Sequence, residues 1–339
     1  MHRLIQILFV TLGVSTLSLN ISNAQDLGSG EKVSGAISCS LCDHRYRSYK
    51  GMNLDSSDFK GSYLFNANFS KSSLVTVNFE SAILVLGNFE RADLTNANLS
   101  KANMGKASMY GATLRGARMI FTDLEGAYLE AAELTGANLT AANMPHVRMP
   151  RVFASGALMR SANLKEADLS GGNFRGANME GTNLSGANLS NADLTLTNLR
   201  DANLRGANLS GANFSYASLL NANLTGADLT GATLYGTNMK GAKFIDADLT
   251  GARIASVIRI GTDFCNARMP VNNDNNDGPK FKLGKCSDKS KKLSKSNQPA
   301  AQAAPPSDGA AATVTPLDPN QPPSDAPASA PNQSPFGPR

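Results

Sequence analysis

The feature that most constrains this chain is a five-residue period that runs without a shift over most of its length. Residues 97–101 read ANLSK and residues 207–211 read ANLSG, for example. From Leu54 to Met269 the central position holds Leu, Phe, Met or Ile in all but two of 44 in-frame repeats, the exceptions being Ala154 and Arg259. The position two residues earlier is nearly always Ala or another small residue. A fixed period of this kind takes precedence over local helix or strand propensity.

A period of five matches neither a helix, which repeats every 3.6 residues, nor a simple strand, which repeats every two. We therefore predict that each repeat forms one side of a square, with its large and its small apolar residue pointing inward. Four repeats then close one coil, and successive coils pair as parallel ladders about 4.8 Å apart. The 44 repeats predict about 11 coils. The absence of Trp and the aromatic content of 6% suit such a thin core.

The pattern Ala-Asn/Asp-Leu-x-x closely resembles the pentapeptide-repeat family over roughly Met52 to Ala267. The resemblance implies an all-β fold, a right-handed quadrilateral parallel β-helix. It says much less about function, because one fold hosts many activities.

The flanking segments differ in composition from the repeats. A short basic start, an apolar run from Leu4 to Leu19 and small residues up to Ala24 predict a secretory signal peptide, with an uncleaved membrane anchor as the alternative. After signal cleavage no membrane-spanning segment is expected. The predicted organisation is a signal peptide at 1–24, an N-terminal cap at 25–51, the β-helix at 52–271, a C-terminal cap at 272–286 and a disordered tail rich in Pro, Ala and Ser at 287–339.

The charge distribution bears on the choice of partner. The chain has a net charge of +5, but Leu54 to Met269 contains 19 Lys and Arg against 18 Asp and Glu, so the repeats are nearly neutral. Some members of the resembled family mimic DNA and protect topoisomerases, which requires a strongly acidic surface in the cytoplasm. The neutral repeats and the predicted export argue against that function and against a nucleic-acid partner.

Two local expectations follow from the twenty-residue coil step. Aromatic residues that recur at this step should stack between coils, as in the pairs Phe59 and Phe79, Phe69 and Phe89, and Phe244 and Phe264. Pro145 and Pro150 occupy the same position of adjacent repeats. Because proline cannot donate to a ladder, we predict a kinked corner or a small bulge there.

The four cysteines lie at the two ends of the repeats. An exported protein meets an oxidising compartment, so the even number predicts disulfides, and Cys265 with Cys286 is the favoured pair among the three pairings that Cys39, Cys42, Cys265 and Cys286 allow. The segments 39–43 and 264–270 also look like the opening and closing elements of exported members of the resembled family. The family then continues directly into repeats, whereas residues 44–50 read as an insertion.

A metal or redox site is the alternative for Cys39, Cys42 and His44, since C-x-x-C is a common spacing of reactive thiols. No second Cys or His pair follows at zinc-finger spacing, and no βαβ pattern surrounds the motif. The sequence therefore favours a structural cap, and no metal or cofactor is expected.

No motif for catalysis is present. The mature chain has two histidines, His44 and His146, and it lacks a nucleophile elbow, a P-loop, a dinucleotide fingerprint and H-E-x-x-H. A convex repeat surface also offers no enclosed pocket that would raise the pKa of a carboxyl group. We therefore predict a protein that is not an enzyme, with His146 as a surface or corner residue.

The leading hypothesis is an exported scaffold or protein-binding rod that recognises a protein or a cell-envelope component through one of its flat faces. The compartment is the periplasm or the extracellular space. An alternative is binding of ice or a polysaccharide by hydroxyl groups that repeat at the coil step, at Ser170, Ser190, Ser210, Thr230 and Thr250. Open coil ends and a near-neutral repeat region are also compatible with a homodimer.

Overall fold

The computed structural model describes residues 36–270. The predicted signal peptide at 1–24, C-terminal cap at 272–286 and tail at 287–339 lie outside the described residues, and so does Cys286.

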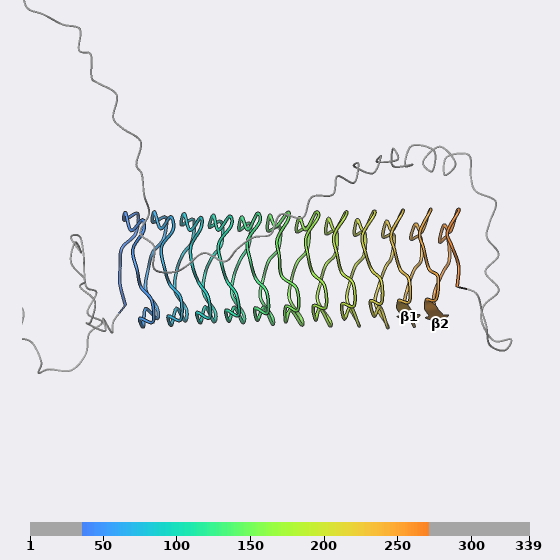
Figure 1. Cartoon of the computed structure of the whole chain (residues 1–339), viewed down its shortest axis with the longest axis horizontal. Coiled ribbons are helices and arrows are strands. Elements are labelled where there is room, and N and C mark those ends of the chain that lie inside the picture. The colour runs from blue at the N-terminus through green and yellow to red at the C-terminus, as the bar shows by residue number, and fades with distance from the viewer. Residues whose placement is uncertain (1–35, 271–339) are drawn as a thin grey trace, which may run out of the picture. The chain divides into compact units, whose positions relative to one another are not determined.

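Residues 36–270 form a stack of β-coils (Figure 1). From Ser38 to Arg268, residues pair in parallel with the residue twenty positions further along the chain. One coil therefore takes four repeats, as the five-residue period predicts. Most sides are too short to form more than a single bridge. In the described part of the chain two segments extend to strands, β1 (Thr233–Tyr235) and β2 (Arg253–Ala255), which pair in parallel with Leu234 opposite Ile254.

Backbone hydrogen bonds explain why the coil needs five residues a side. In a typical repeat the N–H of Leu189 donates to the carbonyl of Asn208 in the next coil, at 2.7 Å, and the N–H of Asn188 donates to Ala167 in the preceding coil, at 2.8 Å. Two residues after the central leucine, Asn191 has a φ of 57°. This left-handed backbone turns the chain, and the N–H of Ala192 closes the corner on the carbonyl of Leu189. The same corner position is often glycine, which has no Cβ to oppose a positive φ.

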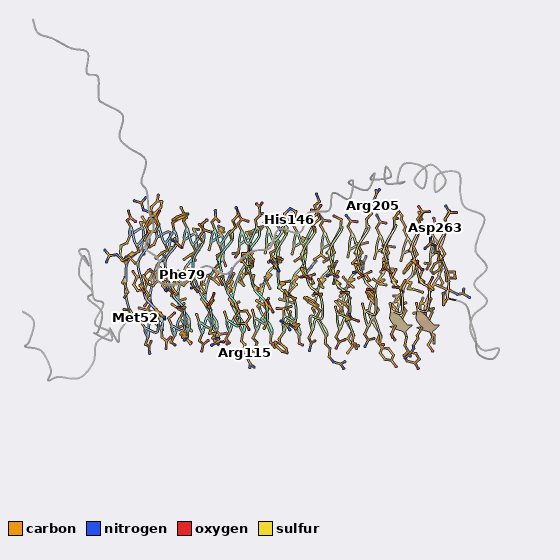
Figure 2. All side chains as sticks on the ribbon, viewed as in Figure 1. Met52, Phe79, Arg115, His146, Arg205 and Asp263 are labelled. Carbon is orange, nitrogen blue, oxygen red and sulfur yellow. A yellow bond between two sulfur atoms is a disulfide. The ribbon has the colours of Figure 1, made fainter. Side chains whose placement is uncertain are left out.

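The core consists of the large central residues and the small residues that precede them by two positions. Nearly all of both sets are fully buried. Figure 2 shows Phe79 inside the stack, while Arg115 and Arg205 project from its edges. The predicted aromatic stacks are confirmed, with ring centroids 5.3 Å apart for Phe59 and Phe79, 5.0 Å for Phe69 and Phe89, and 5.1 Å for Phe244 and Phe264.

Asparagine and aspartate before the central residue serve both the turn and the ladder. The Asn183 carbonyl oxygen Oδ1 accepts the backbone N–H of Ser185 at 3.3 Å, which is the hydrogen bond of an Asx turn. Its amide nitrogen Nδ2 donates to Oδ1 of Asn163 in the preceding coil at 3.1 Å. The chain of side-chain bonds continues from Asn163 to Asn143 and from Asn203 to Asn183. The preference for Asn or Asp at this position therefore has a structural cause.

The coils begin earlier than the sequence predicted. Ser38, Asp43 and Ser48 already pair with the coil that follows. Cys39, His44 and Tyr49 are buried at the central positions of these three repeats. The prediction of a cap at 25–51 and of an insertion at 44–50 was therefore wrong for residues 37–51, because only aliphatic and Phe side chains were counted as central residues.

The prediction of a kink at Pro145 and Pro150 was also wrong. The bridges from Asn143 to Asn163 and from Arg148 to Asp168 are intact around both prolines. Proline stands here directly after the central residue, where the N–H of other repeats bonds to an Asx side chain and not to the ladder. The carbonyl of Pro145 still accepts the N–H of Gly126 at 3.0 Å. Proline is tolerated because the ladder does not use that donor.

We expect proline tolerance to depend on position within the repeat. Arg148→Pro removes the N–H that donates to the carbonyl of Ala127 at 2.9 Å, and it should cost about 3 kcal/mol of unfolding free energy. Pro145→Ala should change that free energy by less than about 1 kcal/mol. Urea unfolding followed by circular dichroism measures both values, with Arg148→Ala as the control for the lost side chain. Equal changes of unfolding free energy in Arg148→Pro and Pro145→Ala would contradict this explanation.

Candidate functional site

The predicted hydroxyl ladder lies in one column of the stack. Each member of the ladder stands two positions after a residue that pairs with the next coil, and this pairing places the members in register. The pairing residues are Asp168, Asn188, Asn208, Asp228 and Asp248. These partners precede Ser170, Ser190, Ser210, Thr230 and Thr250, respectively. The column therefore exists as a structural feature.

Hydroxyl groups of this column close turns. Ser210 donates its hydroxyl to Oδ1 of Asn208 at 2.8 Å, and Thr250 donates its hydroxyl to Oδ1 of Asp248 at 2.6 Å. The hydroxyl and the backbone N–H of Thr250 hold the pKa of the Asp248 carboxyl below its usual range. These hydroxyls bond within their own repeat, which makes them less available to a ligand.

A cluster of apolar side chains is exposed on the first coils. Its exposed members are Leu41, Tyr46, Tyr63, Ile83 and Leu86, and its half-buried members are Phe65 and Val85; we call these seven residues the aromatic patch. Leu41 is 74% exposed and Tyr46 is 68% exposed. Large exposed apolar clusters on a folded protein mark sites of interaction.

Some members of the aromatic patch meet between neighbouring coils. The rings of Tyr46 and Phe65 meet edge to face, with centroids 5.6 Å apart. Tyr63 pairs with Ile83 through the backbone. An ion pair at the edge of the patch joins Arg45 to Asp43 at 2.7 Å and lowers the pKa of Asp43 to about 2. The patch therefore combines an apolar centre with a charged rim, as protein interfaces do.

A shallow groove lies further along the stack. It has a volume of about 310 Å³ and is lined by Glu90, Ser108, Tyr110, Tyr128, Glu130, Arg148 and Pro150. The Arg148 guanidinium lies over the Tyr128 ring, 5.7 Å from its centroid.

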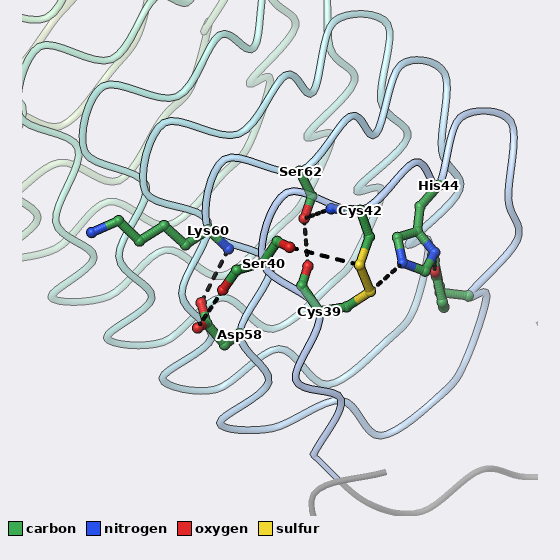
Figure 3. Close-up of a disulfide and its surroundings, with 8 residues drawn as sticks. Cys39, Ser40, Cys42, His44, Asp58, Lys60 and Ser62 are labelled. Carbon is green, nitrogen blue, oxygen red and sulfur yellow. Dashed lines mark hydrogen bonds between the residues drawn. A yellow bond between two sulfur atoms is a disulfide. The ribbon is translucent and has the colours of Figure 1, made fainter. Parts of the chain in front are cut away.

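The first coil contains a disulfide between Cys39 and Cys42, whose Cα atoms are 5.6 Å apart (Figure 3). Ser62 of the second coil holds both cysteine backbones. Its hydroxyl donates to the carbonyl of Cys39 at 2.6 Å and accepts the N–H of Cys42 at 3.3 Å. Ser62 stands at the small-residue position and is fully buried, so the disulfide is fixed to the solenoid.

Two buried polar side chains extend this group. His44 Nε2 lies 3.1 Å from Cys39 Sγ, and His44 Nδ1 lies 2.5 Å from the Tyr49 hydroxyl. Burial lowers the pKa of His44 and raises the pKa of Tyr49 well above its usual value. We call Cys39, Cys42, His44 and Tyr49 the cysteine centre.

The cysteine centre bears on the metal alternative raised by the sequence. The ligand atoms of Cys39, Cys42 and His44 lie within 4.8 Å of one another. Both sulfur atoms are bonded to each other, so neither is a thiolate ligand in this state. At the other end Cys265 is 3% exposed, and its pairing with Cys286 stays a prediction.

His146 lies on the surface, as predicted. Its side chain is 55% exposed, and Nδ1 contacts Glu166 Oε2 at 3.4 Å; Figure 2 shows it at the edge of the stack. Residues 36–270 contain no helix of the length and apolar character needed to cross a membrane.

The family model for pentapeptide repeats matches the chain with eight copies, and the matched ranges include 50–80, 72–111, 107–144, 162–201, 202–241 and 232–269. These matches cover more than half of the chain. The chain belongs to the pentapeptide repeat family. None of the curated proteins matches it with significance.

Solved structures of this family resemble the chain to different degrees. HetL, involved in heterocyst differentiation regulation in the cyanobacterium Nostoc sp., is 27% identical over 68% of this chain and 94% of its own, with a TM-score of 0.40. A pentapeptide repeat protein of the Arabidopsis thaliana thylakoid lumen is 31% identical over 37% of this chain and 70% of its own, with a TM-score of 0.17. QnrB1, a plasmid-mediated fluoroquinolone resistance protein, is 17% identical over 70% of this chain and 91% of its own, with a TM-score of 0.23.

Sequence reasoning missed the aromatic patch. A signal for it was present, because Tyr63, Phe65 and Ile83 stand at outward positions that hold polar or small residues in most repeats. It also missed His44 and Tyr49 as core residues, because the frame was not extended below Met52.

We expect Ser62→Ala to loosen the cysteine centre, because it removes one acceptor and one donor from the cysteine backbones. The loss of a buried hydrogen bond costs about 1–3 kcal/mol, so the amide hydrogen of Cys42 should exchange with solvent about tenfold faster or more. Ser72→Ala is the matched control, since the Ser72 hydroxyl is buried at the same position of a later repeat and donates to Phe69. Unchanged exchange at Cys42 would contradict the assigned role of Ser62.

Proposed function

We propose that this pentapeptide repeat protein is an exported, non-enzymatic scaffold that binds a protein or cell-envelope component through the aromatic patch. The patch supports this proposal because its side chains extend outward from a rigid stack of hydrogen-bonded coils. Rigid aromatic side chains lose little conformational entropy on binding and are enriched among the residues that dominate interface energies.

Binding is better supported than catalysis. The two carboxyl groups that line the groove at Tyr128 already have partners, because Glu90 accepts the Ser108 hydroxyl at 3.1 Å and Glu130 pairs with Arg151.

The two alternative functions have less support. Binding of ice or a polysaccharide would use hydroxyls of the ladder, but those of Ser210 and Thr250 donate to neighbouring side chains. Mimicry of DNA needs a dense negative surface, whereas the repeats carry nearly equal numbers of acidic and basic residues.

The test compares patch variants in a pull-down from native host envelope fractions, after cell fractionation has located the mature chain. Tyr46→Ser together with Leu86→Ser removes two exposed apolar side chains of the patch. If each of the two side chains contributes about 2 kcal/mol to the binding free energy, retention of the bound component should fall more than tenfold.

The matched control is Phe121→Ser together with Leu196→Ser. Both residues are exposed apolar side chains at corner positions outside the patch, at φ 57° and 60°. This control should retain the partner at the level of the unmodified chain. Equal loss in both double variants, or equal retention, would overturn the patch as the binding surface. Recovery of the protein in the cytoplasm would overturn the proposed export.

A further inference from the structure

The two sulfurs of the Cys39–Cys42 disulfide differ in access. Cys39 is at a central core position and is 6% exposed, whereas Cys42 is half-buried. Thiol–disulfide exchange begins when a thiolate attacks one sulfur in line with the bond, and access decides which sulfur is attacked. An incoming thiol therefore reaches Cys42 Sγ first, and Cys39 becomes the leaving group.

The hydrogen bonds of the cysteine centre determine the tautomer of His44. A disulfide sulfur carries no proton, so the contact of 3.1 Å between His44 Nε2 and Cys39 Sγ requires a proton on Nε2. Nδ1 is then an acceptor, and it receives the Tyr49 hydroxyl proton at 2.5 Å. Tyr49 thereby orients the Nε2–H of His44 toward the sulfur that would leave.

Packing keeps His44 in this neutral form. Its ring lies edge to face on Phe59, with centroids 5.9 Å apart, and burial lowers its pKa. The titratable groups that act on His44 are Asp43, Arg47 and Tyr49 of the first coil. Asp58 and Lys60 of the second coil lie on the other side of the disulfide (Figure 3). His44 is therefore a fixed neutral donor beside Cys39.

We propose that the cysteine centre is a thiol–disulfide exchange site, at which Cys42 forms a mixed disulfide with a thiol of the glutathione class. The attacking thiolate forms a new S–S bond with Cys42 Sγ, and the bond between Cys42 and Cys39 breaks. The electron pair of the broken bond stays on Cys39, whose thiolate accepts the Nε2–H of His44. A second thiolate then attacks the sulfur of the bound thiol, which releases the small-molecule disulfide and leaves both cysteines reduced.

The hydrogen bond to His44 favours the charged form of Cys39. We therefore expect the pKa of the Cys39 thiol in the reduced protein to be lower with the His44 donor present than without it, although burial by itself raises the pKa of a thiol. Each pKa unit changes the equilibrium between the two protonation states tenfold. His44 acts on the leaving sulfur directly, and Tyr49 is a positioning residue.

The first test identifies the attacked sulfur in the full mature chain. The oxidised protein is treated with reduced glutathione in the presence of a chelator, and free thiols are blocked with iodoacetamide. Peptide mass spectrometry should find glutathione on Cys42 and the alkyl group on Cys39. Glutathione on Cys39 would overturn the proposal. So would a Cys39–Cys42 disulfide that stays intact in the presence of reduced glutathione.

The second test isolates the contribution of His44. His44→Phe should shift the exchange equilibrium with glutathione about tenfold toward the protein disulfide, and it should raise the pKa of the Cys39 thiol, measured by thiolate absorbance against pH. His44→Gln retains an N–H donor and should restore most of the effect. Tyr49→Phe removes the hydroxyl that orients His44 and should also raise the pKa of the Cys39 thiol. Circular dichroism checks that each variant keeps its fold. An unchanged thiol pKa in correctly folded His44→Phe would refute the assigned role.

Discussion

The structure depends on the parallel backbone hydrogen bonds between successive coils, in which each bridge residue pairs with the residue twenty positions further along the chain. Each side of a coil contributes few backbone bonds, so no coil is stable alone, and the stack gains its stability from neighbouring coils. This pairing requires the inward side chains to recur in register, with a large residue and a small one on every side. Stacked phenylalanines are a direct result, because Phe69 and Phe89 occupy the same place in successive coils.

The turns place a second constraint on the outward positions. Asn or Asp before the central residue bonds both to its own turn and to a neighbouring coil, as Asn183 does to the preceding coil. Hydroxyls such as that of Thr250 assist the same turns. Most polar residues of the surface thus have a structural role, and a regular hydroxyl column is not by itself evidence of a ligand. Function is better sought where outward residues depart from this pattern, as in the aromatic patch.

The first coil departs from the pattern of large apolar residues at the central positions. Nearly all central positions elsewhere hold Leu, Phe, Met or Ile, but the first coil holds Cys39, His44 and Tyr49 there, which are buried polar or reactive groups. Buried polar groups are costly unless they bond to one another. Their mutual contacts, together with the hold of Ser62 on the cysteine backbones, satisfy that requirement. The same contacts bring a proton donor to one sulfur of the Cys39–Cys42 disulfide.

The five-residue period determined by itself the inward positions, because these follow from residue types at a fixed spacing. With the square coil that the family resemblance implies, it also predicted the aromatic stacks. It could not locate the start of the coils, since Cys39, His44 and Tyr49 do not resemble central residues until the pairing of Ser38 with Asp58 places them. It also misjudged Pro145, because only the hydrogen-bond pattern shows which N–H groups the ladder leaves unused. Tertiary structure alone decided that Tyr46 meets Phe65 and that His44 meets Cys39, since contacts between residues on different sides or coils depend on side-chain direction as well as spacing.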